Sequence, residues 1–282
     1  MGLWFNGLLE EEGLDLSKVR LLRHQDRQLS TRSLTPYRAW IENRAAFETY
    51  QRTQLKERQS YFRGCYWASF VGTPDGRTMF VGLYEVALVG PIKPGHVDPL
   101  SGRPLEASRY DLYDCRLTTG LRDYAGRLFI HWGEGSAHRA WVQRADSKSG
   151  NKRIVELQPG FQEPDFPGYA AFARPLSEIE ALPATWASAL RAARGVYLLT
   201  CPQTREQYVG AAYGEDGFLG RWTQYARDGH GGNVRLKSRN PSDYQASILE
   251  IASFATSEAE IIEMEARWKS KLQSREMGLN AN

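Results

Sequence analysis

The clearest pattern of apolar and polar positions lies near the C-terminal end of the chain. Two apolar runs, residues 195–201 and 207–212, flank a polar, proline-containing segment at residues 202–206. Runs of strand length joined by a short turn-forming connection predict a β-hairpin. Each run also holds a tyrosine close to a glycine, so two phenol groups could stand side by side on one face.

Helical patterns surround this hairpin. Pro183 is placed to start a helix that leads into Gly195, after a segment at residues 177–180 with the form of a capping box. Aromatic residues at helical spacing predict a second helix over residues 218–227, and an apolar stripe predicts a third over residues 258–273.

The N-terminal part begins with helical patterns and then changes to strands. A short amphipathic helix over residues 2–11 should end at Gly13, and Thr35-Pro36 should start a helix that runs past residue 55. Five apolar segments then predict strands at residues 65–71, 79–88, 128–132, 139–144 and 153–157. Residues 91–109 are rich in proline and glycine and should form a loop.

These elements predict an α+β protein with two domains. The segment 159–175 is rich in proline, glycine and aromatic residues, so the boundary is expected near residue 175, which gives domains of residues 1–175 and 176–282. Closely spaced strands after a helical lead-in favour a small curved sheet or barrel in the first domain. A PUA-like barrel, a type that often reads nucleic acids, is one form that it could take.

Composition narrows the class of protein. In 282 residues, 24% are charged and 41% are hydrophobic, which is typical of a globular chain. No apolar run approaches the ~18 residues that a bilayer span needs, and the first residues lack the features of a signal peptide. The three cysteines are widely scattered, which favours a reducing environment. We therefore expect a cytoplasmic protein with no membrane partner.

Positive charge is concentrated in two segments, although the formal net charge is only +3. The first segment sets six cations against the single acid Asp26; they are Lys18, Arg20, Arg23, Arg27, Arg32 and Arg38. The second contains His230 within a glycine-rich run, followed by Arg235, Lys237 and Arg239. Both are candidates for contacts with nucleic-acid phosphates, and a solvated surface is a nearly equal alternative for the first.

Two charged residues sit at unusual places in the helical patterns. Arg221 lies at the edge of an apolar stripe, where a surface position and a phosphate-binding position are both open. Glu265 falls inside the apolar stripe of the last helix, whereas Glu263 points to the other side. An inward carboxylate needs a cationic partner, so either Mg²⁺ or a salt bridge, for instance to Arg221, would explain it.

Together these pieces resemble the GIY-YIG nuclease superfamily over roughly residues 186–282. The resemblance rests on elements in a fixed order: Gly195-Val196-Tyr197, Tyr208-Val209-Gly210, Arg221, a helix-borne Glu265 and Gly278-Leu279-Asn280. It is strengthened by an Ala-Tyr-Gly turn and a Gly-His-Gly-Gly-Asn loop like those of bacterial members. It implies three antiparallel strands flanked by helices, and metal-dependent hydrolysis of a DNA phosphodiester.

The resemblance also implies roles for individual residues. Tyr197 would act on or orient the attacking water, and Tyr208 would help to hold the water and the phosphate. Arg221 would stabilise charge on the phosphate, and Glu265 would bind Mg²⁺ (or Mn²⁺). Asn280 and His230 would support the site. Tyr225 stands where some relatives carry histidine, which leaves the general base open.

The sequence therefore predicts a Mg²⁺-dependent, restriction-like DNA endonuclease whose N-terminal domain chooses the target. Recognition of modified DNA is one form that this choice could take. The alternatives are a DNA-binding protein that keeps the fold without cutting, and a nuclease directed at RNA. A site of this type cuts one strand per event, so double-strand cleavage would need a homodimer or two visits.

Overall fold

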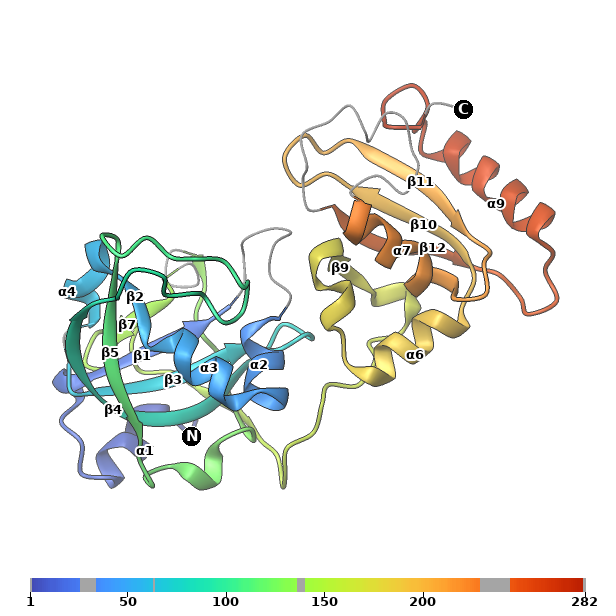
Figure 1. Ribbon diagram of the computed structural model, residues 1–282. Helices are drawn as coiled ribbons and strands as arrows, with labels where there is room; N and C mark the ends of the chain where they lie inside the picture. The colour runs from blue at the N-terminus through green and yellow to red at the C-terminus, as the bar shows by residue number, and fades with distance from the viewer. Residues whose placement is uncertain (1, 26–33, 63, 136–139, 229–243, 281–282) are drawn as a thin grey trace. The chain divides into compact units, whose positions relative to one another are not determined.

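The computed structural model describes residues 2–25, 34–62, 64–135, 140–228 and 244–280 (Figure 1). The chain forms two compact units, of which the first ends at Pro164 and the second runs from Asp165. Both contain helices and sheet, so the α+β class is confirmed. The second unit begins earlier than the boundary expected near residue 175.

The first unit is built around a strongly curved sheet with helices packed against it. Its helices are α1 (Phe5–Glu11), α2 (Pro36–Glu42), α3 (Arg44–Gln51) and α4 (Gln59–Phe62). Its strands are β1 (Val19–His24), β2 (Thr53–Leu55), β3 (Tyr66–Gly72), β4 (Thr78–Pro91), β5 (Tyr110–Leu117), β6 (Leu128–Ile130), β7 (Val142–Arg144) and β8 (Ile154–Leu157).

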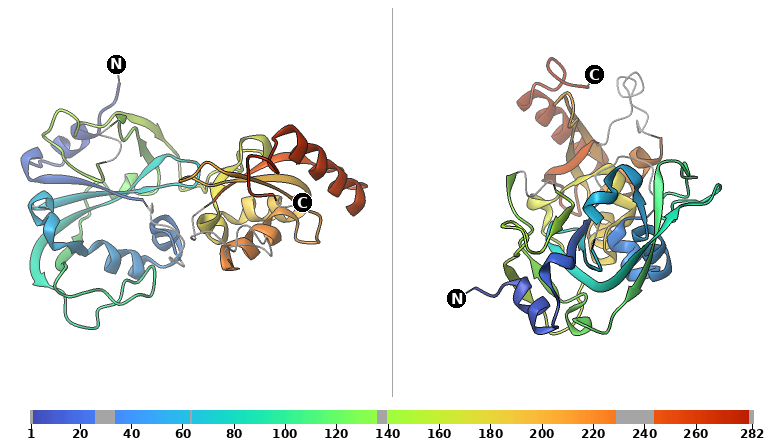
Figure 2. Two further views of the ribbon diagram at one scale, coloured as in Figure 1. Left: turned by 90° about the horizontal axis from the view of Figure 1, so that it is seen from above. Right: turned by 90° about the vertical axis from the view of Figure 1, so that its left-hand side faces the viewer.

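The strand order is β2-β5-β4-β3-β1-β7, with β6 pairing both β4 and β8. Strand β4 is 14 residues long and pairs in turn with β3, β5 and β6, so it carries the bend of the sheet. The result is a curled half-barrel (Figures 1 and 2). The expected small, curved sheet is confirmed at this level of detail.

Two features of the first unit differ from the sequence prediction. The helix that begins at Pro36 ends at Glu42 instead of running past residue 55, because Asn43 leaves the helical conformation and its side chain caps α3 through the amide of Ala46. Strand β1 was not expected, because Arg20 and Arg23 suggested a basic surface segment.

The second unit contains one four-stranded antiparallel sheet in the order β11-β10-β12-β9. Its elements are β9 (Ala173–Pro175), α6 (Ala184–Ala192), β10 (Gly195–Thr200), β11 (Gln207–Ala212), α7 (Gly217–Asp228), β12 (Gln245–Ile251) and α9 (Glu258–Lys271). The predicted hairpin and the three predicted helices are therefore present.

Helices cover both faces of this sheet. Along β10, Tyr197 and Leu199 pack in one apolar core with residues of α6 and α7, whereas Val196 packs in a second core with Ile261 of α9. This alternation follows from the period of two along a strand. Helices α7 and α9 consequently flank β11, the edge strand, from opposite faces.

Other details of the second unit depart from expectation. The sheet has a fourth strand, β9, contributed by residues 173–175, which precede the expected domain start. Residues 177–180, expected as a capping box, lie within a 3-10 helix, Leu176–Ala181, whose N-cap position is Pro175. A capping box starts α9, where Ser257 and Glu260 cap each other's backbone amides.

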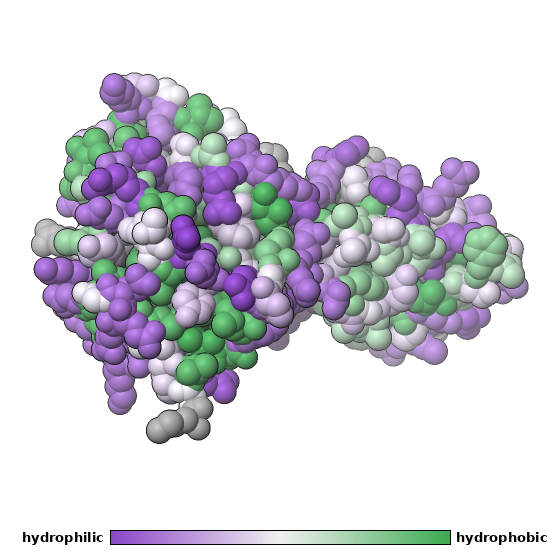
Figure 3. Space-filling view, turned by 90° about the horizontal axis from the view of Figure 1, so that it is seen from below, coloured by the Kyte–Doolittle hydropathy of each residue, from purple (hydrophilic) through white to green (hydrophobic). Residues whose placement is uncertain are grey.

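The surface mixes hydrophilic and hydrophobic side chains on the face shown in Figure 3. Within the described part of the chain, no helix combines the length and apolar character that crossing a membrane requires.

Candidate active site

The glycines of the hairpin make room for Tyr197. Tyr197 on β10 lies opposite Gly210 on β11, and its side chain is fully buried. A Cβ atom at position 210 would lie 2.4 Å from the Tyr197 hydroxyl oxygen and from the adjoining ring carbon. Only glycine therefore allows the phenol ring to lie across β11.

Gly195 is required for a different reason. Its φ of +147° is rarely adopted by residues with a side chain, and an added Cβ would lie 2.1 Å from the carbonyl oxygen of Glu250. The pairing of β10 with β12 shifts register just beyond it, between Val196 and Tyr197. Gly195 thus sets the local path of β10 that brings Tyr197 under α7.

Helix α7 places an arginine over this phenol. Tyr197 donates a hydrogen bond from its hydroxyl to that of Tyr225 (3.1 Å), and the Nε of Arg221 donates to the Tyr197 hydroxyl (3.3 Å). One Nη of Arg221 donates to the Tyr225 hydroxyl (3.4 Å) and the other to Gln224 (3.0 Å). The guanidinium also lies 5.0 Å from the centre of the Tyr225 ring. Arg221 is therefore held in one orientation.

Burial keeps the two inner phenols neutral. It raises the pKa of Tyr197, with proximity to Tyr208 adding to the rise, although Arg221 opposes both. Burial likewise raises the pKa of Tyr225. A phenol with a raised pKa holds its proton at neutral pH. Tyr197 is thus suited to positioning Arg221. Its side chain lacks the exposure that direct action on water, the expected role, would need.

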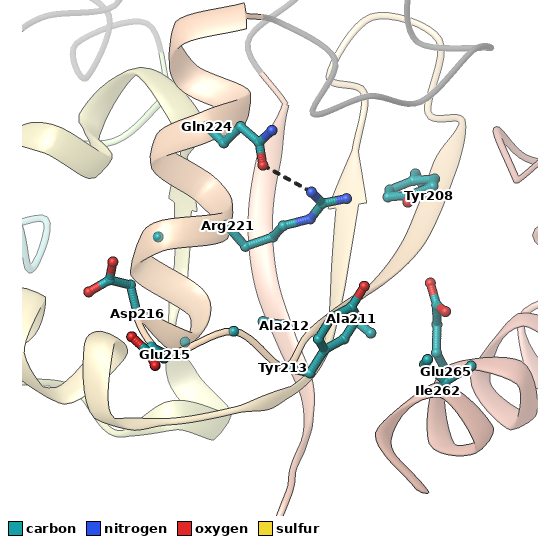
Figure 4. Close-up of a pocket in the computed structure, with 13 residues that line it drawn as sticks. Tyr208, Ala211, Ala212, Tyr213, Glu215, Asp216, Arg221, Gln224, Ile262 and Glu265 are labelled. Carbon is teal, nitrogen blue, oxygen red and sulfur yellow. Dashed lines mark hydrogen bonds between the residues drawn. The ribbon is translucent and has the colours of Figure 1, made fainter. Parts of the chain in front are cut away.

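A cleft of about 620 Å³ opens beside this cluster. Tyr208 of β11, Tyr213 and Glu215 of the following loop, Arg221 and Gln224 of α7, and Ile262 and Glu265 of α9 are among the residues that line it. Figure 4 shows Arg221, Tyr208 and Glu265 reaching the same space from three different elements. We call it the Arg221 cleft. It brings together three of the six expected catalytic residues.

Glu265 has a cationic partner, although not the one expected. Its carboxylate lies 3.4 Å from the ammonium of Lys269, one turn later on α9. Both side chains are largely covered, with 15% of Glu265 and 9% of Lys269 exposed. The pair explains how a carboxylate is tolerated on the packing side of the helix.

The residues present fit a magnesium ion bound by one carboxylate. Within the described ranges, no group of three or more histidine, cysteine, aspartate or glutamate side chains is arranged to hold a metal. Magnesium does not require such a group, because it keeps several waters and is often held by one or two carboxylates plus substrate phosphates. Glu265 keeps a second oxygen for this purpose at the wall of a roomy cleft.

Asn280 supports the site from beneath. Its side-chain oxygen accepts from the amide of Val209 (2.9 Å) and its side-chain nitrogen donates to the carbonyl of Val209 (2.8 Å). The amide of Leu279 donates to the carbonyl of Gln207, and a Cβ at Gly278 would lie 2.3 Å from that same oxygen. Residues 278–280 therefore lie along β11 and fix the strand that carries Tyr208.

The expected DNA contacts of the first basic segment are corrected in part. Arg20 and Arg23 lie on β1, between β3 and β7, and are only 8% and 5% exposed. The Arg20 guanidinium donates to the carbonyls of Ser17 and Val19, and that of Arg23 lies over the Trp132 ring. All six residues of β1 are buried, so these two cations serve the fold. Lys18 is exposed.

Six of the expected residues lie outside the described part of the chain: Arg27, Arg32, His230, Arg235, Lys237 and Arg239. Tyr213 and Gln224 are among the cleft residues that the sequence analysis did not predict. Tyr213 follows β11 within the Ala-Tyr-Gly turn, and Gln224 is three positions after Arg221 on α7. That spacing of three on a predicted helix is a signal that could have found Gln224.

In comparisons with known proteins, the chain matches no protein-family model, no curated protein and no solved structure.

Proposed function

We propose that the protein is a Mg²⁺-dependent DNA endonuclease whose second unit is a GIY-YIG-type catalytic module. One observation carries the proposal: Arg221, held by two buried phenols, shares a cleft with Tyr208 and the carboxylate of Glu265. A fixed, permanently charged donor beside a carboxylate that can hold a metal is what hydrolysis of a phosphodiester needs.

Arg221 has donors left for a phosphate. A guanidinium carries five N–H groups, and contacts with Tyr197, Tyr225 and Gln224 use three of them among the described residues. The remaining two, one on each Nη, form a fork that matches two phosphate oxygens. As water attacks phosphorus and the bond to the leaving oxygen breaks, Arg221 would stabilise the charge that develops.

The other side chains have distinct parts in the proposed reaction. Tyr208 lines the cleft and would hold the attacking water and a phosphate oxygen through its hydroxyl. Tyr197 and Tyr225 would keep Arg221 in place, and their raised pKa values prevent them from taking up the role of base. Glu265 would hold Mg²⁺, which when bound supplies positive charge next to the phosphate and the leaving oxygen.

The test is cleavage of supercoiled plasmid by the purified full chain, with and without Mg²⁺. Glu265→Gln keeps the shape of the side chain but removes its charge, so we expect at least a hundredfold loss of nicking rate. Glu263→Gln, at an exposed position on the same helix, should cut like the wild type. Cleavage that survives Glu265→Gln undiminished would rule out the proposed site. Parallel reactions on RNA of the same sequence decide the substrate class.

A second candidate is a DNA-binding protein that does not cut. The observation that favours it is the ion pair of Glu265 with Lys269. The ammonium group of Lys269 partly neutralises the carboxylate charge that would attract a metal. Binding of duplex DNA without nicking in Mg²⁺, Mn²⁺ or Ca²⁺ would support this second candidate. Target choice by the first unit is part of both proposals, as in a restriction enzyme.

A further inference from the structure

A second pocket lies on the outer side of α7. Its volume is about 380 Å³, and Arg191 of α6 and Arg227 of α7 line it together with Thr223. We call it the Arg191–Arg227 pocket. Three further residues, Asp216, Gly220 and Gln224, line both this pocket and the Arg221 cleft. The two cavities are therefore neighbours that share one wall.

Gly220 lies in the wall that the two cavities share, and it has no side chain to raise that wall. Positions 216, 220 and 224 are spaced by four residues, so they form one ridge along the exposed side of α7. A Cβ at Gly220 would lie 2.5 Å from the Cβ of Asp216, so a larger residue would crowd the first turn of the helix. Because Gly220 has no side chain, the ridge between the two cavities is lowest at this point.

The charges of the pocket suit an anion that can compete for them. Arg191 and Arg227 are 60% and 74% exposed at their side chains. Their carboxylate partners are Asp216, at 3.4 Å, and Glu180, at 2.9 Å, and both of these are also exposed. Exposed ion pairs are weak, so the guanidinium groups can exchange a carboxylate for a phosphate. Two cations and one acid line the pocket itself.

We propose that the Arg191–Arg227 pocket binds backbone phosphate of the nucleic-acid strand that flanks the phosphate held at Arg221. The strand would pass over Gly220, with Gln224 beside it. Six residues separate Arg221 from Arg227, which is about 9 Å along the helix axis. Successive phosphates of one strand rise about 3.4 Å along a duplex, so the offset corresponds to about two or three nucleotides. This inference rests on the proposed function and names how its substrate is gripped.

The experiment measures binding of a fluorescent DNA duplex to the full chain by anisotropy, in Ca²⁺ and over a series of salt concentrations. Arg191→Ala and Arg227→Ala should each reduce the slope of log Kd against log salt by about 1, because each loses one phosphate contact. Arg267→Ala is the matched control. Arg267 is 57% exposed, lies 3.8 Å from Glu250 and lines neither cavity, so its slope should equal that of the wild type.

The outcomes separate this inference from the proposed function. Unchanged slopes for both Arg191→Ala and Arg227→Ala, with normal plasmid cleavage by the wild type, overturn the inference alone. Reduced slopes in a protein that never cuts support the pocket and overturn the nuclease. A full chain that binds no nucleic acid overturns both.

Discussion

At the scale of single residues, neighbouring side chains fix the orientation of Arg221 and balance the charge of Glu265 in the Arg221 cleft. Arg221 is fixed by Tyr197, Tyr225 and Gln224, and Glu265 is balanced by Lys269. The two arrangements differ in consequence. In the proposed reaction, the first would hold a cation ready for a phosphate, whereas the second would place a cation where it competes with a bound metal.

Lys269→Met should therefore lower the Mg²⁺ concentration needed for half-maximal cleavage. If the ion pair with Glu265 contributes about 1 kcal/mol, the shift is about fivefold. Lys271→Met, at an exposed position near the end of the same helix, is the control and should leave the requirement unchanged. The measurement is a Mg²⁺ titration of plasmid nicking. An unchanged or higher requirement in Lys269→Met would show that Lys269 does not compete with the metal.

A buried histidine in the first unit should make stability depend on pH. Burial lowers the pKa of His24 to about 3, while its hydrogen bond with Gln51 opposes the change. The unfolded chain, with a histidine pKa of about 6.5, then binds more protons between these values. The stabilising effect is complete above pH 6.5 and is lost as pH falls towards 3. From pH 8 to pH 5 this costs about 2 kcal/mol.

The prediction is that His24→Gln removes this cost. Between pH 8 and pH 5, the free energy of unfolding of the wild type should fall by about 2 kcal/mol more than that of the variant. Urea denaturation at the two pH values measures it, and groups other than His24 affect both proteins alike. Equal losses would mean that His24 titrates normally in the folded state.

At the scale of elements, the hairpin of β10 and β11 is the part on which the site depends. Its glycines are required by close approaches, at Gly195 to the backbone of β12 and at Gly210 to the ring of Tyr197. Strand β11 also carries Tyr208 and is held at its edge by residues 278–280. A change in this hairpin should therefore alter stability and catalysis together.

Gly210→Ala tests that dependence. The added methyl would overlap the Tyr197 ring, and forced overpacking of this kind costs about 1–3 kcal/mol. Displacement of Tyr197 should also loosen Arg221, so the nicking rate should fall even where the variant is fully folded. Gly7→Ala in α1 is the control, since a Cβ there meets nothing within 4 Å and should leave stability equal or higher. A Gly210→Ala variant as stable and active as the wild type would contradict the packing argument.

Much of the second unit could be predicted from local signals, and the misses share a cause. The periodicity of apolar residues predicted helices α7 and α9, and turn residues between two apolar runs predicted the hairpin. Strand β9 has only three residues, and its pairing with β12 is decided by tertiary contact. In the first unit, Arg20 and Arg23 made β1 resemble a surface segment, although the strand pairs on both edges and all its side chains are buried by tertiary packing.

The sequence predicted which residues belong to the candidate site better than it predicted how those residues are arranged. Arg221 and Glu265 were noticed from their places in helical patterns, and the family resemblance added Tyr208 and implied a site for all three. The burial of Tyr197 was not predicted, because it depends on the missing side chain at Gly210 across the sheet. The partner of Glu265 was also misjudged, although Lys269 stands one helical turn away in the sequence.

At the scale of the whole molecule, the two units separate at residues 164–165 rather than near residue 175. The segment between these positions belongs to the second unit. Phe172 is 1% exposed and stacks on Trp222 of α7, with ring centres 5.3 Å apart and planes inclined by 9°. Strand β9 follows directly and completes the sheet beside β12.

A fragment of residues 165–282 should therefore fold with native stability, whereas residues 176–282 should not. Loss of a buried aromatic residue costs about 3–5 kcal/mol, and the pairing of β9 is lost as well. Thermal unfolding followed by circular dichroism compares the two fragments. Equal melting temperatures would show that residues 165–175 contribute nothing to the module. Phe172→Ala in the longer fragment separates the effect of the ring from that of the strand.

The contacts of residues 278–280 with β11 should also affect how readily the protein aggregates. An edge strand with free peptide groups is a template on which another chain can add a strand. Here Asn280 occupies the outward amide and carbonyl of Val209 across 71 positions of sequence. Proteolytic clipping after α9 would uncover this edge while leaving the rest of the sheet intact. The clipped molecules should self-associate into aggregates before they unfold, so residues 278–280, which also fix the strand that carries Tyr208, protect the protein against misassembly.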